Sequence, residues 1–280
     1  MAGYIGERAR RKKRNTRIIL LLIVGFFSGL IAGLLGVGGG LVIIPVVHYI
    51  LNFYGYSLDI SMHVAIASSI GVICVNSISS VYAHYKLGNI EIEVLKKWYI
   101  GVVLGSILGA FFASSINGNL LVIIFVFIAS LVAISMFLNF NIILANNLPK
   151  NFLLNNTISF IIGFFSVLIG IGGGSFSVPT LTVFGKNIHR AVGTSASIGF
   201  FIAVPGFITY ALTGWQIQGL PNYSLGYVSL PIVIIVASVS IFTAPLGAKL
   251  SNQTNKRTLK KFFATFLLLI CVTLVIEQFY

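Results

Sequence analysis

Two stretches of the sequence share one unusual pattern. Residues 33–45 read GLLGVGGGLVIIP, and residues 167–179 read VLIGIGGGSFSVP. Each places a glycine cluster inside a long apolar run, with a proline five residues after the last glycine. In a helix interior glycine costs about 1 kcal/mol and proline about 3 kcal/mol relative to alanine. Both stretches therefore predict a helix that is interrupted.

The composition around these stretches indicates a membrane protein. Of the 280 residues, 57% are hydrophobic and 8% are charged, whereas soluble domains carry about 25% charged residues. A helix needs about 20 apolar residues to cross a bilayer. Eight runs qualify, roughly 18–50, 62–85, 98–116, 119–145, 153–185, 189–213, 225–250 and 258–278. We expect an all-α polytopic protein with about eight transmembrane segments and short loops.

The net charge of +13 does not indicate nucleic-acid binding, because the basic residues form short runs between apolar segments. Basic residues at the ends of spanning segments set orientation and attract anionic lipids. We interpret residues 1–17 as a basic cytoplasmic tail. The expected partners are the lipid bilayer and a small solute, with a homo-oligomer left open and no nucleic acid.

The chain also repeats itself. Gly36 and Pro45 recur 134 positions later (36 to 170, 45 to 179) as Gly170 and Pro179. Other matches follow in the same order, as an internal duplication would give. Such duplication is the usual build of secondary transporters. The two transmembrane repeats would cover residues 18–148 and 149–280.

The orientation of the second repeat is less clear. With a cytoplasmic amino terminus, simple alternation of eight crossings puts Lys86 inside and Lys249 outside. The second placement opposes the rule that cytoplasmic loops are basic. An inverted second repeat would remove the conflict but needs an odd number of crossings in the first. The crossing count stays open at this point.

The breaks can be explained by a binding site. The runs 18–50 and 153–185 each have 33 residues, and a straight helix of that length spans about 50 Å against a hydrocarbon core of about 30 Å. Each run would therefore enter as two half-helices or a re-entrant hairpin. Broken backbone at this depth survives only where protein buries it or where it lines a wet cavity. The other explanation is that the glycines only permit close helix crossing.

The half-helix N-termini carry partial positive charge and free N–H groups, so the breaks predict an anion site. Pro45 and Pro179 would enlarge each break by removing one hydrogen-bond donor. Ser175 could cap the second half-helix. The nearby hydroxyl groups could donate to the anion or to their own helix, Asn76 could bond a neighbouring helix or the solute, and His84 could be interfacial. The predicted substrate-binding residues are Gly38, Gly39, Gly40, Gly172, Gly173, Gly174, Ser175, Ser68, Ser69, Thr194, Ser195, Asn76 and His84.

The positions of the acidic residues indicate which kinds of transport the protein can perform. The five acids, Glu7, Asp59, Glu91, Glu93 and Glu277, all lie near predicted helix ends or loops. Proton relays and cation sites normally place a carboxylate inside the membrane, and the sequence has no Walker A motif for ATP. An anion that leaves a cell with a negative interior gains about 2.3 kcal/mol per charge per 100 mV. We therefore expect anion export, with no cofactor and no metal.

Three features together resemble the TauE/SafE family of sulfite exporters and anion permeases. They are the doubled glycine–proline segment, HYKLGNI at residues 84–90 and APLGAKL at residues 244–250. The resemblance implies a permease of the bacterial plasma membrane for small anions such as sulfite, sulfoacetate or a similar organosulfonate. It departs from symmetry at one point, because Tyr210 stands where the second repeat would match His84.

Two other functions stay open. The same cavity could serve a permease or scramblase for neutral solutes or lipids. An intramembrane hydrolase would need Ser195 as nucleophile and His84 as base, but no serine sits in a G-x-S-x-G elbow. We therefore expect a transporter rather than an enzyme.

Overall fold

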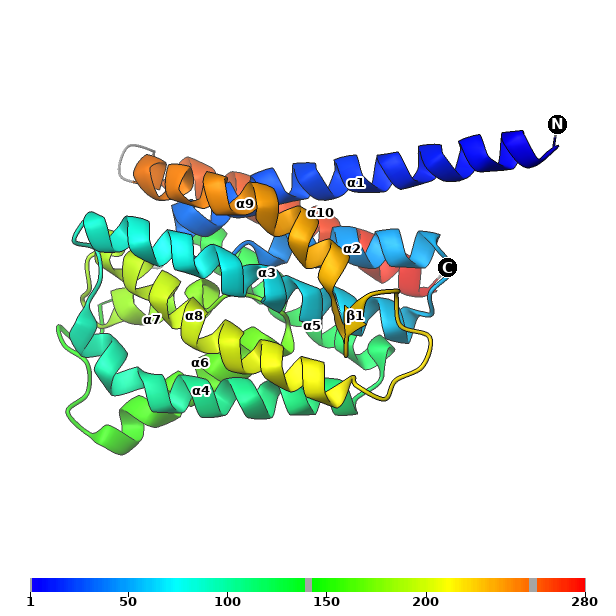
Figure 1. Ribbon diagram of the computed structural model, residues 1–280. Coiled ribbons are helices and arrows are strands. Elements are labelled where there is room, and N and C mark those ends of the chain that lie inside the picture. Colours follow the sequence, from blue (N-terminus) through cyan, green and yellow to red (C-terminus); the bar gives the residue numbers. More distant parts are fainter. Residues whose placement is uncertain (1, 139–142, 252–255, 280) are drawn as a thin grey trace.

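The computed structural model describes residues 2–138, 143–251 and 256–279. For residues 2–14, 256–260, 262–263 and 277–279 it describes the backbone alone. Figure 1 shows a helical bundle, as the composition predicts. The helices are α1 Ala2–Leu35, α2 Gly40–Phe53, α3 Leu58–Lys86, α4 Ile92–Ser115, α5 Gly118–Leu138, α6 Phe152–Leu168, α7 Gly174–Val183, α8 Ile188–Thr213, α9 Leu230–Ser251 and α10 Lys256–Phe279. Two short strands, β1 Ser224–Leu225 and β2 Val228–Ser229, form a hairpin before α9.

Six described helices are long and apolar enough to cross a membrane, in addition to shorter apolar helices. The two 33-residue runs are the ones that break, the first into α1 and α2 and the second into α6 and α7. The prediction of glycine-broken helices is therefore confirmed. The six spans are Asn15–Leu35, Leu58–Lys86, Ile92–Ser115, Gly118–Leu138, Ile188–Thr213 and Leu230–Ser251.

The broken pairs enter the bundle from opposite ends. In Figure 1, α2 runs back toward the end from which α1 came, and α7 likewise runs back toward the starting end of α6. Three long helices follow each hairpin, α3 to α5 after the first and α8 to α10 after the second. The second series therefore runs in the reverse direction. The repeat boundaries at residues 148 and 149 stay a prediction.

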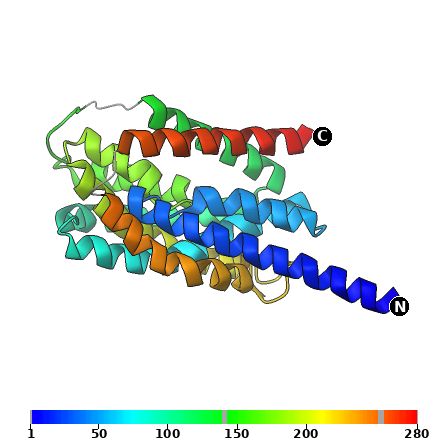
Figure 2. The ribbon, with the colours of Figure 1, turned by 90° about the horizontal axis from the view of Figure 1, so that it is seen from above.

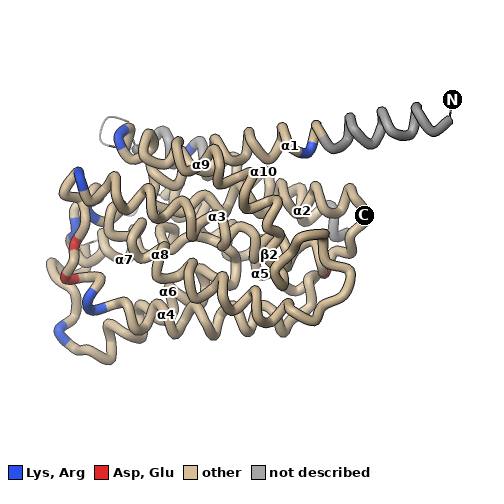
Figure 3. The backbone as a smooth tube through the Cα atoms, viewed as in Figure 1, with Lys and Arg blue, Asp and Glu red and all other residues tan. Residues whose placement is uncertain are grey.

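This reversal corrects the simple alternation expected from eight crossings. Lys86 lies at the C-terminal end of α3 and Lys249 in the last turn of α9. Both helix ends lie at the same end of the bundle, opposite the amino terminus (Figures 1 and 3). The expectation that Lys86 shares a side with the amino-terminal tail is wrong, because the first run turns back instead of crossing.

Glycine rows bring two helix pairs into backbone contact. A Cβ atom built on Gly25 of α1 would lie 2.6 Å from the carbonyl oxygen of Val236 in α9. One built on Gly101 of α4 would overlap the Ser159 hydroxyl of α6. Small residues four apart let helices approach in lipid, where no hydrophobic force drives them together. The two rows are Gly25, Gly29 and Gly33 in α1 and Gly101, Gly105 and Gly109 in α4.

The remaining long helices form a separate flank. Viewed from above in Figure 2, α10 lies alongside α5 at the edge of the bundle. Helices α3 and α8 pack against each other at the centre of the bundle. The two helical hairpins, α1–α2 and α6–α7, lie beside them. The hairpin turns therefore lie inside the bundle, among buried residues.

Candidate binding site at the two helix breaks

Each break is an unwound turn that glycine makes possible. In the first, Gly36, Gly38 and Gly39 have φ values of 69°, 80° and 80°. In the second, Gly170 has a φ of 64°. This left-handed conformation is open to glycine without the steric cost that a Cβ atom brings. The glycine clusters therefore end α1 and α6 where the sequence predicts.

The two breaks touch each other through their main chains. A Cβ atom built on Gly174 would overlap the carbonyl oxygen of Gly36. A Cβ atom built on Gly40 would overlap the carbonyl oxygen of Gly170 in the same way. The two contacts are equivalent, because each partner lies 134 positions from its counterpart (36 to 170, 40 to 174). Only glycine fits at these points.

Helix starts converge on this crossing. Gly40 is the first residue of α2 and Gly174 the first of α7, and neither helix has an acidic residue in its first turn. A helix N-terminus carries a partial positive charge of about half a unit. The crossing therefore joins two positive helix ends with no carboxylate in either first turn.

Several main-chain donors at the crossing are unused. Within the described part of the chain, the turn amides of Gly38, Gly39, Gly172 and Gly173 donate no hydrogen bond. Gly39, Gly172 and Gly173 are buried. Buried N–H groups nearly always have a partner. These four amides are therefore donors without an acceptor among the described residues, and of the four glycines Gly38 lines the cavity beside the first break.

A small cavity lies beside the first break. Its volume is about 10 Å³, which is about the space that one water molecule needs. The wall comes from α1 and its turn, from one face of α3 and from α8. Its main lining residues are Gly36, Gly38, Asn76, Ser77, Ser80 and Gly199.

Asn76 presents a donor at this cavity. The side chain is 1% exposed, and its Oδ1 atom accepts a hydrogen bond of 2.6 Å from the Ser240 hydroxyl of α9. Its Nδ2 atom has no acceptor among the described residues, and neither does the hydroxyl of buried Ser80. Ser240 thereby fixes the orientation of the Asn76 amide group, and the Nδ2 hydrogens of Asn76 bond no described residue. Of the two partners predicted for Asn76, the neighbouring helix is observed.

The other predicted hydroxyl groups lie elsewhere. Ser69 donates to the carbonyl oxygen of Gly170 at 2.8 Å, across the two repeats. Ser68 accepts from the Ser229 amide at 3.0 Å, and Thr194 accepts from the Glu91 amide at 2.9 Å. These three groups bond protein and do not line the cavity. Buried Ser195 also lies outside the lining, with no partner for its hydroxyl among the described residues.

Ser175 does not cap the second half-helix. The N-cap of α7 is Gly173, which makes no side-chain cap bond, and the Ser175 hydroxyl has no partner within the described chain. The prediction is wrong because α7 begins at Gly174, which puts its N-cap two residues before Ser175. Pro45 and Pro179, which were predicted to enlarge the breaks, lie inside α2 and α7, and both helices continue through them. The chain is interrupted at the glycines and not at the prolines.

His84 and Tyr210 perform equivalent tasks in the two repeats. The His84 Nε2 atom lies 3.2 Å from the carbonyl oxygen of Gly33, near the end of α1. The Tyr210 hydroxyl donates to the carbonyl oxygen of Val167 at 3.0 Å, near the end of α6. Each pair is related by the repeat (84 to 210, 33 to 167). His84 therefore bonds the helix before the break and does not line the cavity.

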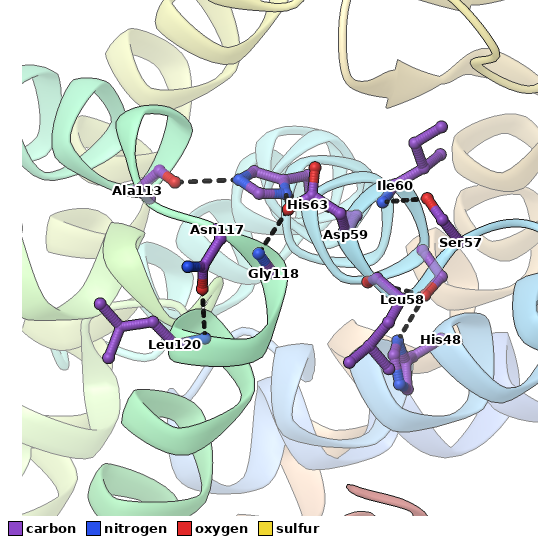
Figure 4. Close-up of polar contacts among 11 residues, drawn as sticks. His48, Ser57, Leu58, Asp59, Ile60, His63, Ala113, Asn117, Gly118 and Leu120 are labelled. Atoms are coloured by element: carbon purple, nitrogen blue, oxygen red, sulfur yellow. Dashed lines mark hydrogen bonds and ion pairs between the residues drawn. The ribbon is translucent and has the colours of Figure 1, made fainter.

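A second polar cluster stands apart from the cavity (Figure 4). The two ring nitrogens of buried His63 lie 2.7 Å and 3.0 Å from the carbonyl oxygens of Asp59 and Ala113. The Asp59 carboxylate accepts from the Gly118 amide, and the His63 ring stacks on Tyr227 at 4.9 Å. The cluster joins the start of α3 to the end of α4 and the start of α5. Its role is structural.

Glu91 links the two repeats at the end of the bundle opposite the His63 cluster. Its carboxylate oxygens lie 2.9 Å from Arg190 and 3.5 Å from Lys186, and its side chain is 16% exposed. The hydrogen bond from Arg190 is the main reason that the pKa of Glu91 is lowered. Figure 3 shows acidic residues among basic ones at this end. The cluster ties the start of α4 to the segment that leads into α8.

Sequence reasoning missed several lining residues. Ser77, Ser80 and Gly199 line the cavity with Asn76, and Ser240 orients it. Asn76 and Ser80 are four residues apart, which places them on one face of a helix, so the sequence did contain a signal for Ser80. Among the described residues, no group of three or more metal-ligating side chains is found.

Comparisons with known proteins agree with this architecture. Residues 21–274 match the family described as Sulfite exporter TauE/SafE. A Haemophilus influenzae protein named "Probable membrane transporter protein" is 33% identical over 262 residues, covering 94% of this chain and 99% of the relative. A similarly named Methanocaldococcus jannaschii protein is 31% identical over 256 residues, covering 86% and 89%. No solved structure matches. With broken, glycine-crossed helices and a family match over nearly its whole length, this chain belongs to the TauE/SafE family of membrane transporters.

Proposed function

We propose that this protein is a permease for small anions and that the anion binds in the cavity beside the first helix break. The observation that carries the proposal is the Asn76 amide, whose Nδ2 atom is buried without an acceptor among the described residues, in a cavity that Gly36 and Gly38 of the first break also line. An unpaired buried donor costs about 1–3 kcal/mol. A solute with acceptor oxygens would remove that cost.

The donors in this site are neutral. The lining contains amide, hydroxyl and main-chain groups and no lysine or arginine. Two helix N-termini add partial positive charge without a fixed ion. A transport site must bind strongly enough to admit the solute and weakly enough to release it. Neutral donors suit that requirement.

The cavity is smaller than the proposed solute. A volume of about 10 Å³ takes about one water molecule, whereas sulfite has four heavy atoms. We infer that the structure represents a closed arrangement, and that α1, α3 and α8 must separate before an anion can bind. Such a change is what alternating access between two repeats would supply.

We propose a sulfur oxyanion, either sulfite or an organosulfonate, as the solute. The matching family is described as a sulfite exporter, and the oxygens of such an anion accept hydrogen bonds from N–H and O–H donors. Export fits the membrane potential, which favours anion exit by about 2.3 kcal/mol per charge per 100 mV. Secondary or potential-driven transport therefore needs no nucleotide.

Reconstituted transport tests this proposal. Proteoliposomes loaded with labelled sulfite or sulfoacetate should release it in a saturable manner. Asn76→Asp removes a donor and adds a negative charge, so we expect release to fall at least about tenfold. Asn117→Asp is the matched control, because Asn117 accepts from the Leu120 amide at the start of α5 and aspartate serves equally well there.

Unchanged release in Asn76→Asp would contradict the proposed site. Absence of anion release combined with transfer of a fluorescent lipid between leaflets would instead support the scramblase alternative. Both assays use the same vesicles, so one preparation decides between the two functions.

Orientation needs its own experiment. The tail, residues 1–17, predicts a cytoplasmic amino terminus in the plasma membrane. The basic residues at the ends of α3 and α9 lie at the opposite end (Figure 3) and predict the reverse under the same rule. Labelling a cysteine introduced at Gly88 with an impermeant reagent in intact cells distinguishes the two. Labelling would support the cytoplasmic amino terminus.

A further inference from the structure

A second cavity lies at the end of the bundle where the chain begins. Its volume is about 230 Å³, far more than that of the cavity at the breaks, and the two share no lining residue. We call it the Arg17 cavity. It is bounded by the middle of α1, the end of α2, the start of α9 and the chain around the β hairpin. Its lining residues include Arg17, Ile50, Tyr56, Asn222, Ser229 and Ile232.

Arg17 brings a positive charge that no acidic side chain in the described part of the protein neutralises. No carboxylate among the described residues pairs with it. Its Nε atom is buried and makes no hydrogen bond within the described chain. The guanidinium lies 5.6 Å from the centre of the Tyr54 ring, a contact that orients the group but accepts none of its hydrogens in the guanidinium plane. The planar donors of arginine match a carboxylate, sulfonate or phosphate.

The wall of the cavity contains a strained residue. Tyr223 has a φ of 61°, the sole positive value of a non-glycine residue in the described chain. Its carbonyl oxygen accepts from the Leu230 amide at 3.2 Å, which fixes the loop to the start of α9. Such backbone costs about 1–2 kcal/mol, and strained positions concentrate at ligand sites and active sites. The loop is thus held in place around the cavity.

The rest of the lining contains both apolar and polar residues, which suits a ligand with an apolar part and a polar part. Ile50 and Ile232 are apolar, whereas Tyr56, Asn222 and Ser229 supply polar groups. We propose that the Arg17 cavity binds an amphiphilic anion, with an acidic head on the Arg17 guanidinium and an apolar body between α2 and α9. The head is a sulfonate, carboxylate or phosphate, which either a free organic anion or an anionic lipid could provide.

This site is independent of the transport proposed above. Ligand binding at Arg17 can be measured in the purified protein without any flux. A failed transport assay therefore leaves the Arg17 proposal standing, and an empty Arg17 cavity leaves the central site standing. The Asn76→Asp variant should bind at the Arg17 cavity as the unchanged protein does.

Calorimetric titration of the full chain in a neutral detergent provides the test. The probe is benzenesulfonate, and benzenesulfonamide is its uncharged counterpart. We expect saturable binding of the sulfonate, at least about tenfold weaker binding in Arg17→Gln, and a smaller loss in Arg17→Lys, which keeps the charge. Arg190→Gln removes the same group at the opposite end and should leave binding unchanged. Equal melting temperatures of Arg17→Gln and the unchanged protein verify the fold.

A second arm identifies the source of the anion. Nanodiscs are prepared from phosphatidylcholine with and without phosphatidylglycerol. If phosphatidylglycerol displaces benzenesulfonate in an Arg17-dependent manner, the occupant is a lipid; if the sulfonate binds equally in both, it is a free solute. Either result supports the site. Equal binding of benzenesulfonamide, equal affinity in Arg17→Gln, or no anion binding in any preparation overturns it.

Discussion

The two helix breaks touch each other through equivalent glycines but differ in backbone conformation and in the side chains around them. Gly39, before α2, has a φ of 80°, whereas its counterpart Gly173 has a φ of −51°. Gly40 and Gly174 make equivalent contacts across the crossing, and His84 and Tyr210 bond equivalent carbonyl groups with different chemistry. Ser69 bonds the second break, whereas its counterpart Ser195 bonds no described residue. The main-chain contacts are therefore shared by the two repeats, whereas the conformation of the turns and the side-chain function are not.

The difference extends to the cavity. On α3 the first repeat presents Asn76, Ser77 and Ser80. The positions 126 residues later (76 to 202, 77 to 203, 80 to 206) hold Ile202, Ala203 and Gly206, and these are packed against neighbouring helices. The polar site thus belongs to one repeat. The comparison shows that a duplicated backbone can carry a site with a single polar face.

The largest effect should come from filling the crossing itself. Gly40→Ala and Gly174→Ala each place a Cβ atom onto a carbonyl oxygen of the other break. Overpacking of this kind costs about 1–3 kcal/mol. We expect both variants to lose thermal stability to a similar extent in detergent. A large loss in one variant alone would break the equivalence of the two crossings.

Transport should respond next, through the cavity beside the first break. A Cβ atom at Gly199 would meet its nearest neighbour, the amide nitrogen of Gly173, at 3.8 Å. Gly199→Ala therefore fits the fold while filling the cavity, and we expect anion efflux to fall severalfold or more with an unchanged melting temperature. Efflux equal to that of the unchanged protein would place the solute elsewhere.

The polar face of α3 allows a finer comparison. Ser80 lines the cavity without a partner, whereas Ser79 donates to the carbonyl oxygen of Asn76 in its own helix. Ser80→Ala should weaken sulfite efflux by about tenfold or more, the value of one hydrogen bond to an anion. Ser79→Ala is the control and should transport normally. Equal effects of the two changes would remove Ser80 from the site.

Ser69 and Ser195 separate structural from binding roles. Ser69→Ala leaves the buried Gly170 carbonyl without its 2.8 Å hydrogen bond, so we expect a loss of about 1 kcal/mol. Ser195→Ala removes an unpartnered hydroxyl and should leave unfolding unchanged. Thermal unfolding of both variants measures the contrast. Loss of efflux in stable Ser195→Ala would show that Ser195 contacts the solute when the site opens.

The smallest effect concerns the link between repeats at Glu91. Its pKa is lowered in the folded protein, chiefly by the hydrogen bond from Arg190. The link therefore contributes its full stability at pH values above the ordinary pKa of a glutamate. This contribution is lost as the pH falls through the lowered pKa of Glu91 in the folded protein. We expect Glu91→Gln to reduce the fall in melting temperature on acidification, by an amount that reflects less than about 1 kcal/mol. An identical pH profile would show that the link carries no stability.

Much of this architecture could be read from residues 33–45 and 167–179. The glycine clusters predict the breaks because glycine alone tolerates their backbone, and the repeated spacing predicts that they correspond. The direction of the second repeat could not be read, because a hairpin and a crossing have the same hydrophobic pattern. Ser240 was also missed, since its contact with Asn76 joins residues 164 positions apart. The N-cap of α7 was misplaced by two residues, at Ser175 instead of Gly173, because the glycine cluster does not fix the residue at which the helix begins.

The contact between the hairpin tips has a consequence for how this transporter can diversify. Because peptide groups meet there with no side chain between them, the dimensions of the centre depend on bond geometry rather than on residue size. The polar side chains of the cavity, by contrast, stand on one face of α3, where they can be replaced without changing this main-chain contact. The spacing of the hairpin tips and the chemistry of the cavity are therefore set by different parts of the chain.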